Sequence, residues 1–311
     1  MKIITITLSP AFDIHCSVPN FKPYHENLAE ITSTDAGGKG VNISRALTLN
    51  GIQNLAFVIL GNDNRDSFER ALNDENIVYR SLSVDGRIRE NITCHTEGAP
   101  ETRISFKGFE VNAELLAKSA DSLLPDVDND TIITFTGRVP SGIDMDSIKS
   151  FLREFSEKGA RLVIDSRSFS LNDLRELKPW LIKPNQEEIS EYLGRNITDF
   201  SEVISAARNL HQDGIENVTV SLGDAGAMLV CDDGTFVAKP PKIDAISTIG
   251  AGDSSIAGFL AAETNGLMSY EKLCLAVAYG SAACLTEGTK PPSAENISDI
   301  LSKIKCITIT Q

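Results

Sequence analysis

The stretch Ser247-Thr248-Ile249-Gly250-Ala251-Gly252-Asp253-Ser254-Ser255-Ile256-Ala257-Gly258-Phe259 joins a glycine turn to the start of an apolar helix. Glycine permits backbone angles that other residues resist, and it lets a ligand come close to the main chain. The first N–H groups of a helix have no partners within the helix, and the helix dipole makes that end attractive to anions. We therefore predict an anion site at Gly250, Ala251 and Gly252, with the Asp253 carboxylate on its rim.

Two interpretations of Asp253 are open from these residues alone. Asp and Ser are favoured at helix starts, so the motif is as consistent with a capped helix as with a ligand site. An anion site with a carboxylate on its rim also suits phosphoryl transfer to an alcohol. In that chemistry the carboxylate takes the hydroxyl proton, while backbone amides stabilise charge on the phosphoryl oxygens.

The composition excludes several classes of protein. The 311 residues suffice for one large α/β domain with an accessory piece, or for two domains. The net charge of −14 argues against a general nucleic-acid binder, although a few local Lys and Arg can form a pocket for a small anion. Six scattered cysteines without a C-x-x-C pair argue against a disulfide framework or a zinc knuckle. No apolar run is long enough to span a membrane and no signal peptide is evident, so we expect a cytoplasmic protein.

Short β-rich runs alternate with helical stretches along the chain. The predicted strands are residues 2–8, 55–60, 78–84, 131–135, 161–165, 181–183 and 218–221, and the predicted helices are residues 41–50, 66–76, 143–158, 171–177, 186–193, 200–213, 273–285 and 297–304. This alternation predicts a mostly parallel sheet with helices on both faces. Ligands bind such sheets at the carboxyl ends of the strands, and polar segments follow several of the predicted strands.

A second, smaller sheet is predicted outside the main core. Residues 13–18 and 27–33 give two of its strands, and a hairpin over residues 89–93 and 101–108 gives the others. Three cations lie on this hairpin in an otherwise acidic chain: Arg89, Arg103 and Lys107. Any one of them, taken singly, is best interpreted as a solvated surface charge.

Six segments, taken in order, resemble the signatures of the PfkB/ribokinase family of sugar kinases. They are Ser9-Pro10-Ala11-Phe12-Asp13, Gly37-Gly38-Lys39-Gly40-Val41-Asn42, the cationic hairpin, Lys183-Pro184-Asn185-Gln186-Glu187-Glu188, Ser221-Leu222-Gly223 and Gly250-Ala251-Gly252-Asp253. The resemblance implies a ribokinase-like three-layer α/β/α fold with a mostly parallel central sheet. It also implies a single kinase domain over residues 1–311, with a small β-sheet lid formed by about residues 12–33 and 88–108. Two positions depart from the family pattern: Ser9 replaces the usual Asn, and Arg138 stands where relatives commonly carry Ser.

The resemblance also implies roles for individual residues. Asp253 is expected to be the catalytic base, with Gly250, Ala251 and Gly252 holding the transferring phosphoryl group. The expected sugar contacts are Asp13, Gly38 and Asn42, and the expected contacts to a phosphate already on the sugar are Lys39, Arg89, Arg103 and Lys107. Arg138 is equally consistent with a further phosphate contact and with a surface side chain.

The remaining expected contacts serve ATP and Mg²⁺. The nucleotide site is expected to include Lys183, Asn185, Ser221, Gly223, Gly226 and Gly280. Asn185 and Glu188 are one helical turn apart and are expected to organise Mg²⁺ through water, although an Asn at this place is also typical of a helix cap.

The sequence therefore predicts an ATP-dependent phosphosugar kinase of the 1-phosphofructokinase/tagatose-6-phosphate kinase branch. Fructose 1-phosphate is the preferred substrate, with tagatose 6-phosphate and fructose 6-phosphate as alternatives. A kinase of an unphosphorylated sugar or nucleoside and a non-catalytic nucleotide- or sugar-binding regulator are weaker alternatives, and the missing dinucleotide fingerprint disfavours a dehydrogenase. In relatives the lid often also pairs two subunits; a homodimer, allosteric control and a monovalent-cation requirement stay open.

Overall fold

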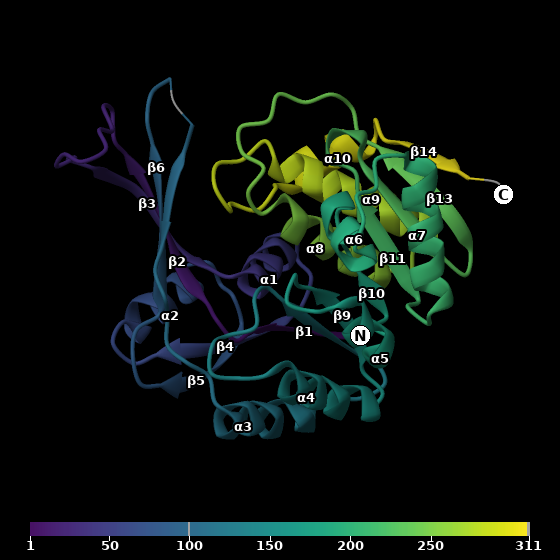
Figure 1. The fold of residues 1–311 in the computed structure, drawn as a ribbon, viewed down its shortest axis with the longest axis horizontal. Helices are drawn as coiled ribbons and strands as arrows, with labels where there is room; N and C mark the ends of the chain where they lie inside the picture. Colours follow the sequence, from purple (N-terminus) through teal and green to yellow (C-terminus); the bar gives the residue numbers. More distant parts are fainter. Residues whose placement is uncertain (99, 310–311) are drawn as a thin grey trace.

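The computed structural model describes residues 1–98 and 100–309, so that residue 99 of the predicted hairpin lies outside the described residues. A ten-stranded sheet with helices on both faces forms the body, and a separate four-stranded sheet projects from it (Figure 1). The spatial order of the large sheet is β14 (Lys305–Thr308), β13 (Gly234–Lys239), β12 (Ala227–Cys231), β11 (Asn217–Ser221), β10 (Leu181–Ile182), β9 (Arg161–Asp165), β8 (Thr131–Thr136), β1 (Lys2–Thr7), β4 (Leu55–Gly61) and β5 (Tyr79–Val84). The strands from β11 through β5 run parallel, and β12, β13 and β14 add antiparallel strands at one edge. This layering confirms the predicted fold class.

Two helical layers bury the faces of the large sheet. One layer contains α3 (Ala113–Leu123), α4 (Met145–Glu157), α5 (Leu171–Leu177), α6 (Gln186–Leu193) and α7 (Phe200–Gln212). The other contains α1 (Lys39–Leu49), α8 (Ala251–Thr264), α9 (Ser269–Ala283) and α10 (Ala294–Leu301), with α2 (Arg65–Asp74) packed beside α1 against β4. All six residues of β8 are buried, as a central parallel strand between two such layers requires.

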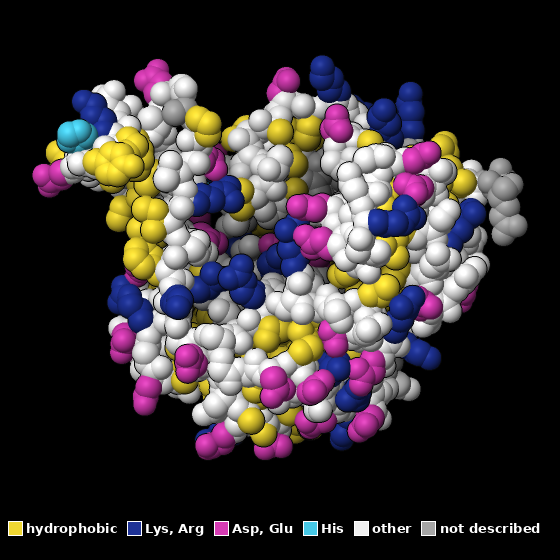
Figure 2. Space-filling model, viewed as in Figure 1, with side chains coloured by type: hydrophobic (Ala, Val, Ile, Leu, Met, Phe, Trp, Pro, Cys, Tyr) yellow, Lys and Arg dark blue, Asp and Glu magenta, His cyan; other side chains and the backbone are white. Residues whose placement is uncertain are grey.

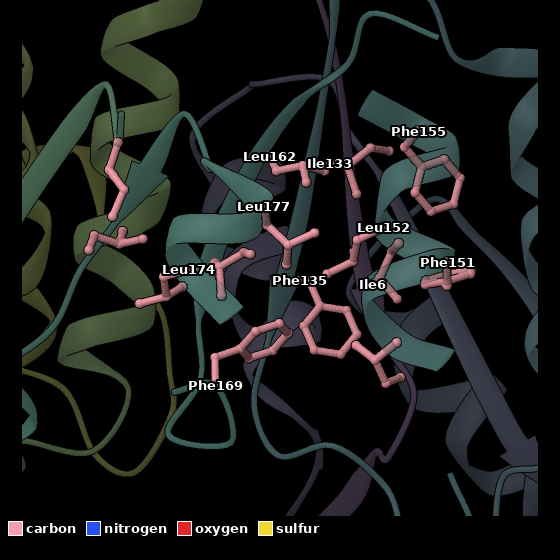
Figure 3. Close-up of a cluster of buried hydrophobic side chains, with 14 of the residues drawn as sticks. Ile6, Ile133, Phe135, Phe151, Leu152, Phe155, Leu162, Phe169, Leu174 and Leu177 are labelled. Carbon is pink, nitrogen blue, oxygen red and sulfur yellow. The ribbon is translucent and has the colours of Figure 1, made fainter. Parts of the chain in front are cut away.

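Aromatic side chains fill the layer between the sheet and helices α4 and α5 (Figure 3). The rings of Phe135 and Phe169 meet edge to face with centroids 5.7 Å apart, and those of Phe151 and Phe155 do so at 4.9 Å. Edge-to-face contact is a favoured arrangement for aromatic pairs. This rigid layer supports the strand ends from which the polar site residues project.

Helices α8 and α9 pack closely at Gly258. A β-carbon at this position would lie 2.7 Å from the Leu275 carbonyl oxygen and 2.9 Å from Tyr279 Cβ. We expect Gly258→Ala to lower the free energy of unfolding by about 1–3 kcal/mol, because the added methyl forces the two helices apart. Urea unfolding measures this, and an unchanged midpoint would contradict the close packing.

The small sheet has the order β3 (Glu30–Gly37), β2 (Ala11–Ser17), β6 (Arg89–His95) and β7 (Thr102–Ser105). The sequence predicted the second strand over residues 27–33, whereas β3 begins at Glu30 and runs to Gly37. The longer strand leads through Gly38 straight into α1. It therefore connects the small sheet directly to the glycine segment of the site.

The sequence prediction missed four helices and strands and misplaced the bounds of two helices. The predicted helix over residues 273–285 is wrong at its start, since α9 begins at Ser269. Helix α3 was missed although Asn112 caps it by accepting the Leu115 N–H at 2.9 Å, which is a recognisable start signal. The hairpin of β12 and β13 and the strand β14 were also missed. The predicted helix over residues 297–304 is wrong at its end, since α10 stops at Leu301 and the chain turns into β14. Strand β14 is short and largely exposed, and it forms only by pairing with β13.

In the described part of the chain, no helix has the length and apolar character needed to cross a membrane.

Candidate active site

The glycine turn that precedes α8 has the geometry of an anion site. Gly250 is the N-cap of α8 and has a φ of 77°, a left-handed angle that glycine adopts without strain. The first-turn N–H groups of α8 follow it, at the positive end of the helix dipole. A β-carbon at Gly252 would lie only 3.2 Å from the Lys183 ammonium, so a positive charge faces the same turn. We call residues 250–253 the anion turn.

Asp253 sits in the first turn of α8 and is 6% exposed. The Asn42 amide donates a hydrogen bond of 2.9 Å to its carboxylate. Burial raises the pKa of Asp253 to about 6, against the opposing effects of Lys39 and Asn42 and with a further increase from Asp165. A carboxylate with a pKa this close to neutral is suited to take a proton from an alcohol. The sequence assigned Asn42 to the sugar, and the structure shows that it also orients Asp253.

Asp165 at the end of β9 lies between two lysines. Its carboxylate is 2.9 Å from the Lys39 ammonium and 3.8 Å from that of Lys183. Burial alone would raise the pKa of Asp165, but Lys183 and Lys39 hold it below its usual value. Burial tends to lower the pKa of Lys39, and Asp165 and Asp253 more than offset this, so that Lys39 stays charged. The sequence prediction did not include Asp165 among the site residues. The feature that could have identified it is a carboxylate at the carboxyl end of a buried strand.

The small sheet places Asp13 at the other side of the site. Asp13 on β2 is aligned with Asn91 on β6, and the Asn91 amide donates to its carboxylate at 2.8 Å. Burial raises the pKa of Asp13, while Asn91 and Arg89 oppose the increase. A β-carbon at Gly37 would lie 2.1 Å from Asp13 Oδ2, so only glycine fits there. The sequence missed Asn91, because cross-strand register decides which polar residue meets Asp13.

The predicted lid cations separate into two groups. Arg89 is half-buried, and its Nε atom has no hydrogen-bond partner within residues 1–98 and 100–309. Burial lowers the pKa of Arg89, Asp13 opposes this decrease, and the nearby Arg138 guanidinium adds to it. Arg103 instead lies on the edge strand β7, bonded at 3.0 Å to Glu101, and Lys107 is exposed beyond the end of that strand.

A hollow separates the small sheet from the larger body, and Lys and Arg side chains gather around it in an acidic protein (Figure 2). The Lys39 side chain lies beside Gly137, where a β-carbon would be 3.9 Å from Lys39 Cβ, and Arg138 is the next residue in the chain. The arrangement concentrates positive charge where an anionic ligand can enter.

Asn185 and Glu188 form a reciprocal cap at the start of α6. The Glu188 N–H donates to Asn185 Oδ1 at 2.8 Å, and the Asn185 N–H donates to Glu188 Oε2 at 2.9 Å. The other Glu188 oxygen accepts the Arg167 Nε–H at 2.9 Å. Within the ranges that the structure describes, no set of three His, Cys, Asp or Glu side chains is placed to hold a metal directly. The side-chain oxygens of Asn185 and Glu188 keep lone pairs that can accept hydrogen bonds from water.

The other predicted nucleotide residues lie at the end of β11, in the turn that follows it and on α9. Ser221 ends β11 and forms a parallel bridge with Asn185, and Gly223 starts the short turn that follows. Gly226 is needed for packing, because a β-carbon there would lie 2.0 Å from the Ala238 carbonyl oxygen. Gly280 on α9 brings that helix against the anion turn, where a β-carbon would lie 3.1 Å from the Ala251 carbonyl oxygen.

Comparison with known proteins places this geometry in context. A family model described as pfkB family carbohydrate kinase matches residues 9–296. The 1-phosphofructokinase of Escherichia coli (strain K12) is 32% identical over 259 residues, which is 83% of each chain. The 1-phosphofructokinase of Haemophilus influenzae is 28% identical over 309 residues, which is 99% of each chain. The crystal structure of phosphofructokinase-2 from Escherichia coli in complex with fructose-6-phosphate has a TM-score of 0.90 and 25% identity, covering 97% of this chain and 98% of that one.

Proposed function

Because the chain belongs to the pfkB family of carbohydrate kinases, we propose that it transfers the γ-phosphoryl group of ATP to a hydroxyl of fructose 1-phosphate, giving fructose 1,6-bisphosphate. The observation that carries the choice of a phosphosugar is the half-buried Arg89 with its unpartnered Nε atom among the described residues. Arg138 stands beside it, and Lys39 approaches the residue that precedes Arg138. A dianionic phosphate would accept hydrogen bonds from Arg89 and Arg138 and offset the repulsion between these two guanidinium groups, which an unphosphorylated sugar would not do.

In the proposed reaction, the anion turn supplies the base and the N–H groups that stabilise the phosphoryl oxygens. Asp253 takes the proton from the attacking hydroxyl, whose oxygen forms the new bond to the γ-phosphorus of ATP. The bond from that phosphorus to the bridging oxygen breaks, and ADP leaves with the electron pair. The first-turn N–H groups of α8 and the Lys183 ammonium stabilise the charge on the phosphoryl oxygens during transfer. Asp13 and Asn42 orient the sugar.

Mg²⁺ is proposed to arrive with ATP, and Asn185 and Glu188 would hold its water ligands. The divalent cation supplies charge neutralisation between the β- and γ-phosphates. The carboxylate and amide oxygens of this pair are hard donors, which Mg²⁺ prefers, and Mg²⁺ commonly retains several waters in proteins. The chain's own contribution is to fix these two side chains through the reciprocal cap and through Arg167.

The small sheet is proposed to act as the lid of this kinase domain, formed by about residues 12–33 and 88–108. A closed lid excludes water, so that the sugar hydroxyl and not water attacks the phosphoryl group. The apolar side chains of Leu28, Ile31, Ile104 and Phe106 are exposed on this sheet and its connections. Exposed apolar side chains on a projecting sheet favour an interface, which supports a homodimer through the lid. Location in the cytoplasm stays a prediction.

Fructose 6-phosphate is the second candidate acceptor, favoured by the close likeness to phosphofructokinase-2. The deciding experiment measures ADP release with Mg-ATP against fructose 1-phosphate, fructose 6-phosphate, tagatose 6-phosphate and the free sugars. We expect the highest kcat/KM with fructose 1-phosphate. A higher kcat/KM with fructose 6-phosphate would identify that sugar phosphate as the substrate instead. Turnover of free sugars alone would contradict the phosphate site at Arg89.

Arg89→Ala tests that phosphate site. We expect kcat/KM for the sugar phosphate to fall about 10²-fold or more, mainly through KM, because a charge-assisted contact to the phosphate is lost. Arg103→Ala is the matched control, since Arg103 is bonded to Glu101, and its kcat/KM should change less than about threefold. Equal effects of the two substitutions would contradict the separation of these cations.

A further inference from the structure

A pair of histidines lies on the side of the small sheet that carries Asp13. His15 on β2 shares a hydrogen bond of 3.0 Å between its Nδ1 atom and the Nε2 atom of His95 on β6. The two rings stack with centroids 5.3 Å apart and an interplanar angle of 18°. Because side chains alternate between the faces of a strand, His15 projects from the same face as Asp13, two residues earlier. His95 in turn lies 3.4 Å from Glu101.

The other nitrogen of His15 contacts the body of the protein. A β-carbon at Gly288 would lie 3.0 Å from His15 Nε2, so the imidazole lies directly beside the turn that joins α9 to α10. His15 is only 8% exposed even though it belongs to the projecting sheet. In Figure 1 this yellow turn reaches from the body toward the small sheet.

The Gly288 turn contacts the anion turn through the residue that follows Gly288. The Thr286 hydroxyl lies 2.6 Å from the Lys290 carbonyl oxygen and 2.8 Å from the Ala283 carbonyl oxygen, and it can donate its one hydrogen to either of them. The next residue, Thr289, is buried against the anion turn, where a β-carbon at Gly250 would lie 3.5 Å from Thr289 Cα. The contact with His15 and the contact with Gly250 are thus made by adjacent residues.

We propose that His15 is a positioning residue that couples the small sheet to the anion turn through the Gly288 turn. The sugar contacts Asp13 on the same strand, so binding of the sugar that draws β2 inward presses His15 on Gly288 and fixes Thr289 against Gly250. The anion turn is then held in place when both substrates are present. His95 fixes the orientation of the His15 ring through the hydrogen bond at His15 Nδ1. The coupling rests on the proposed kinase function for its use, but the contacts themselves do not depend on the identity of the sugar.

The experiment compares substitutions that each retain a polar atom at only one of the two ring-nitrogen positions of His15. Asn at position 15 places a polar atom near the Nδ1 position, which faces His95. Gln places one near the Nε2 position, which faces Gly288. We expect His15→Ala and His15→Asn to lower kcat with the sugar phosphate about tenfold, with KM for ATP changed less than about twofold, because the anion turn is misplaced during transfer. His15→Gln should retain most of the native kcat. His25→Ala, an exposed histidine in the loop between β2 and β3, is the control and should behave as the native protein.

Hydrogen exchange on the ligand-free protein supplies a readout that is independent of turnover. We expect His15→Ala and His15→Asn, but not His15→Gln, to speed exchange at residues 248–253 and 284–292. Native exchange in both segments of His15→Ala would overturn the coupling, as would equal kcat values for the Asn and Gln variants. The effects of His15→Ala and Gly288→Ala on kcat should also be less than multiplicative, because the two groups touch. Failure of the whole sugar panel would instead count against the proposed function and leave the exchange result to stand.

Discussion

Asp253→Asn should lower kcat at least about 10²-fold, the usual effect of removing a general base. The substitution preserves shape and the contact with Asn42 but removes the proton acceptor beside the anion turn. In the native enzyme, activity should fall as the pH is lowered through about 6, because burial raises the pKa of Asp253 to about that value and the protonated carboxyl cannot accept a proton. The measurement is kcat for the sugar phosphate between pH 5 and 8.

The same substitution should not destabilise the protein. A carboxyl whose folded pKa lies above its unfolded pKa contributes stability below the unfolded value and loses it as the pH rises through the folded value. At pH 7.5 the ionised Asp253 is therefore a cost, and Asn removes that cost. We expect Tm at pH 7.5 to equal or exceed that of the native protein, with a smaller difference at pH 5. Asp244→Asn, on an exposed loop residue, is the control for kcat. Retention of more than about a tenth of native kcat by Asp253→Asn would contradict its role as base.

Asp165→Ala should have the largest effect on stability. The substitution leaves the ammonium groups of Lys39 and Lys183 facing each other without their shared carboxylate. Removing one partner of a buried ion pair typically costs about 3–5 kcal/mol. We expect about 3 kcal/mol, at the low end, because the Lys39 side chain is 41% exposed and can turn toward water. Urea unfolding at pH 7 measures the loss.

The pH dependence of this loss has a definite sign. Lys183 and Lys39 hold the pKa of Asp165 below its ordinary value of 3.8, so its stabilising contribution is present at higher pH and is lost as the pH falls through the folded pKa. The difference in stability between the native protein and Asp165→Ala should therefore shrink below about pH 4. Asp213→Ala, which breaks the largely exposed pair with Arg175, is the control and should cost less than about 1 kcal/mol. A loss no greater than that control would show that Asp165 does not balance the two lysines.

Local sequence patterns determine the fold class of this protein and part of its site. The glycine turn before α8 can be predicted from the sequence because a left-handed N-cap favours glycine and because helix starts attract anions. The parallel sheet can be predicted because buried strands such as β4 are apolar on both faces, with helices between the strands. The pairing of Asn185 with Glu188 can be predicted because a helix cap and its reciprocal partner lie three residues apart.

Only the tertiary structure decided which distant side chains meet. Lys39 and Asp165 are 126 residues apart in sequence, and the order of β1, β8 and β9 brings them together. The register of β2 on β6 selects Asn91 as the partner of Asp13, and the same register sets Arg89 beside the site while Arg103 stays in its pair with Glu101. The contact of His15 with Gly288 joins two segments that have no pattern in common. Local sequence preferences act over a few residues, whereas these contacts depend on strand order and register, which the packing of the whole chain fixes.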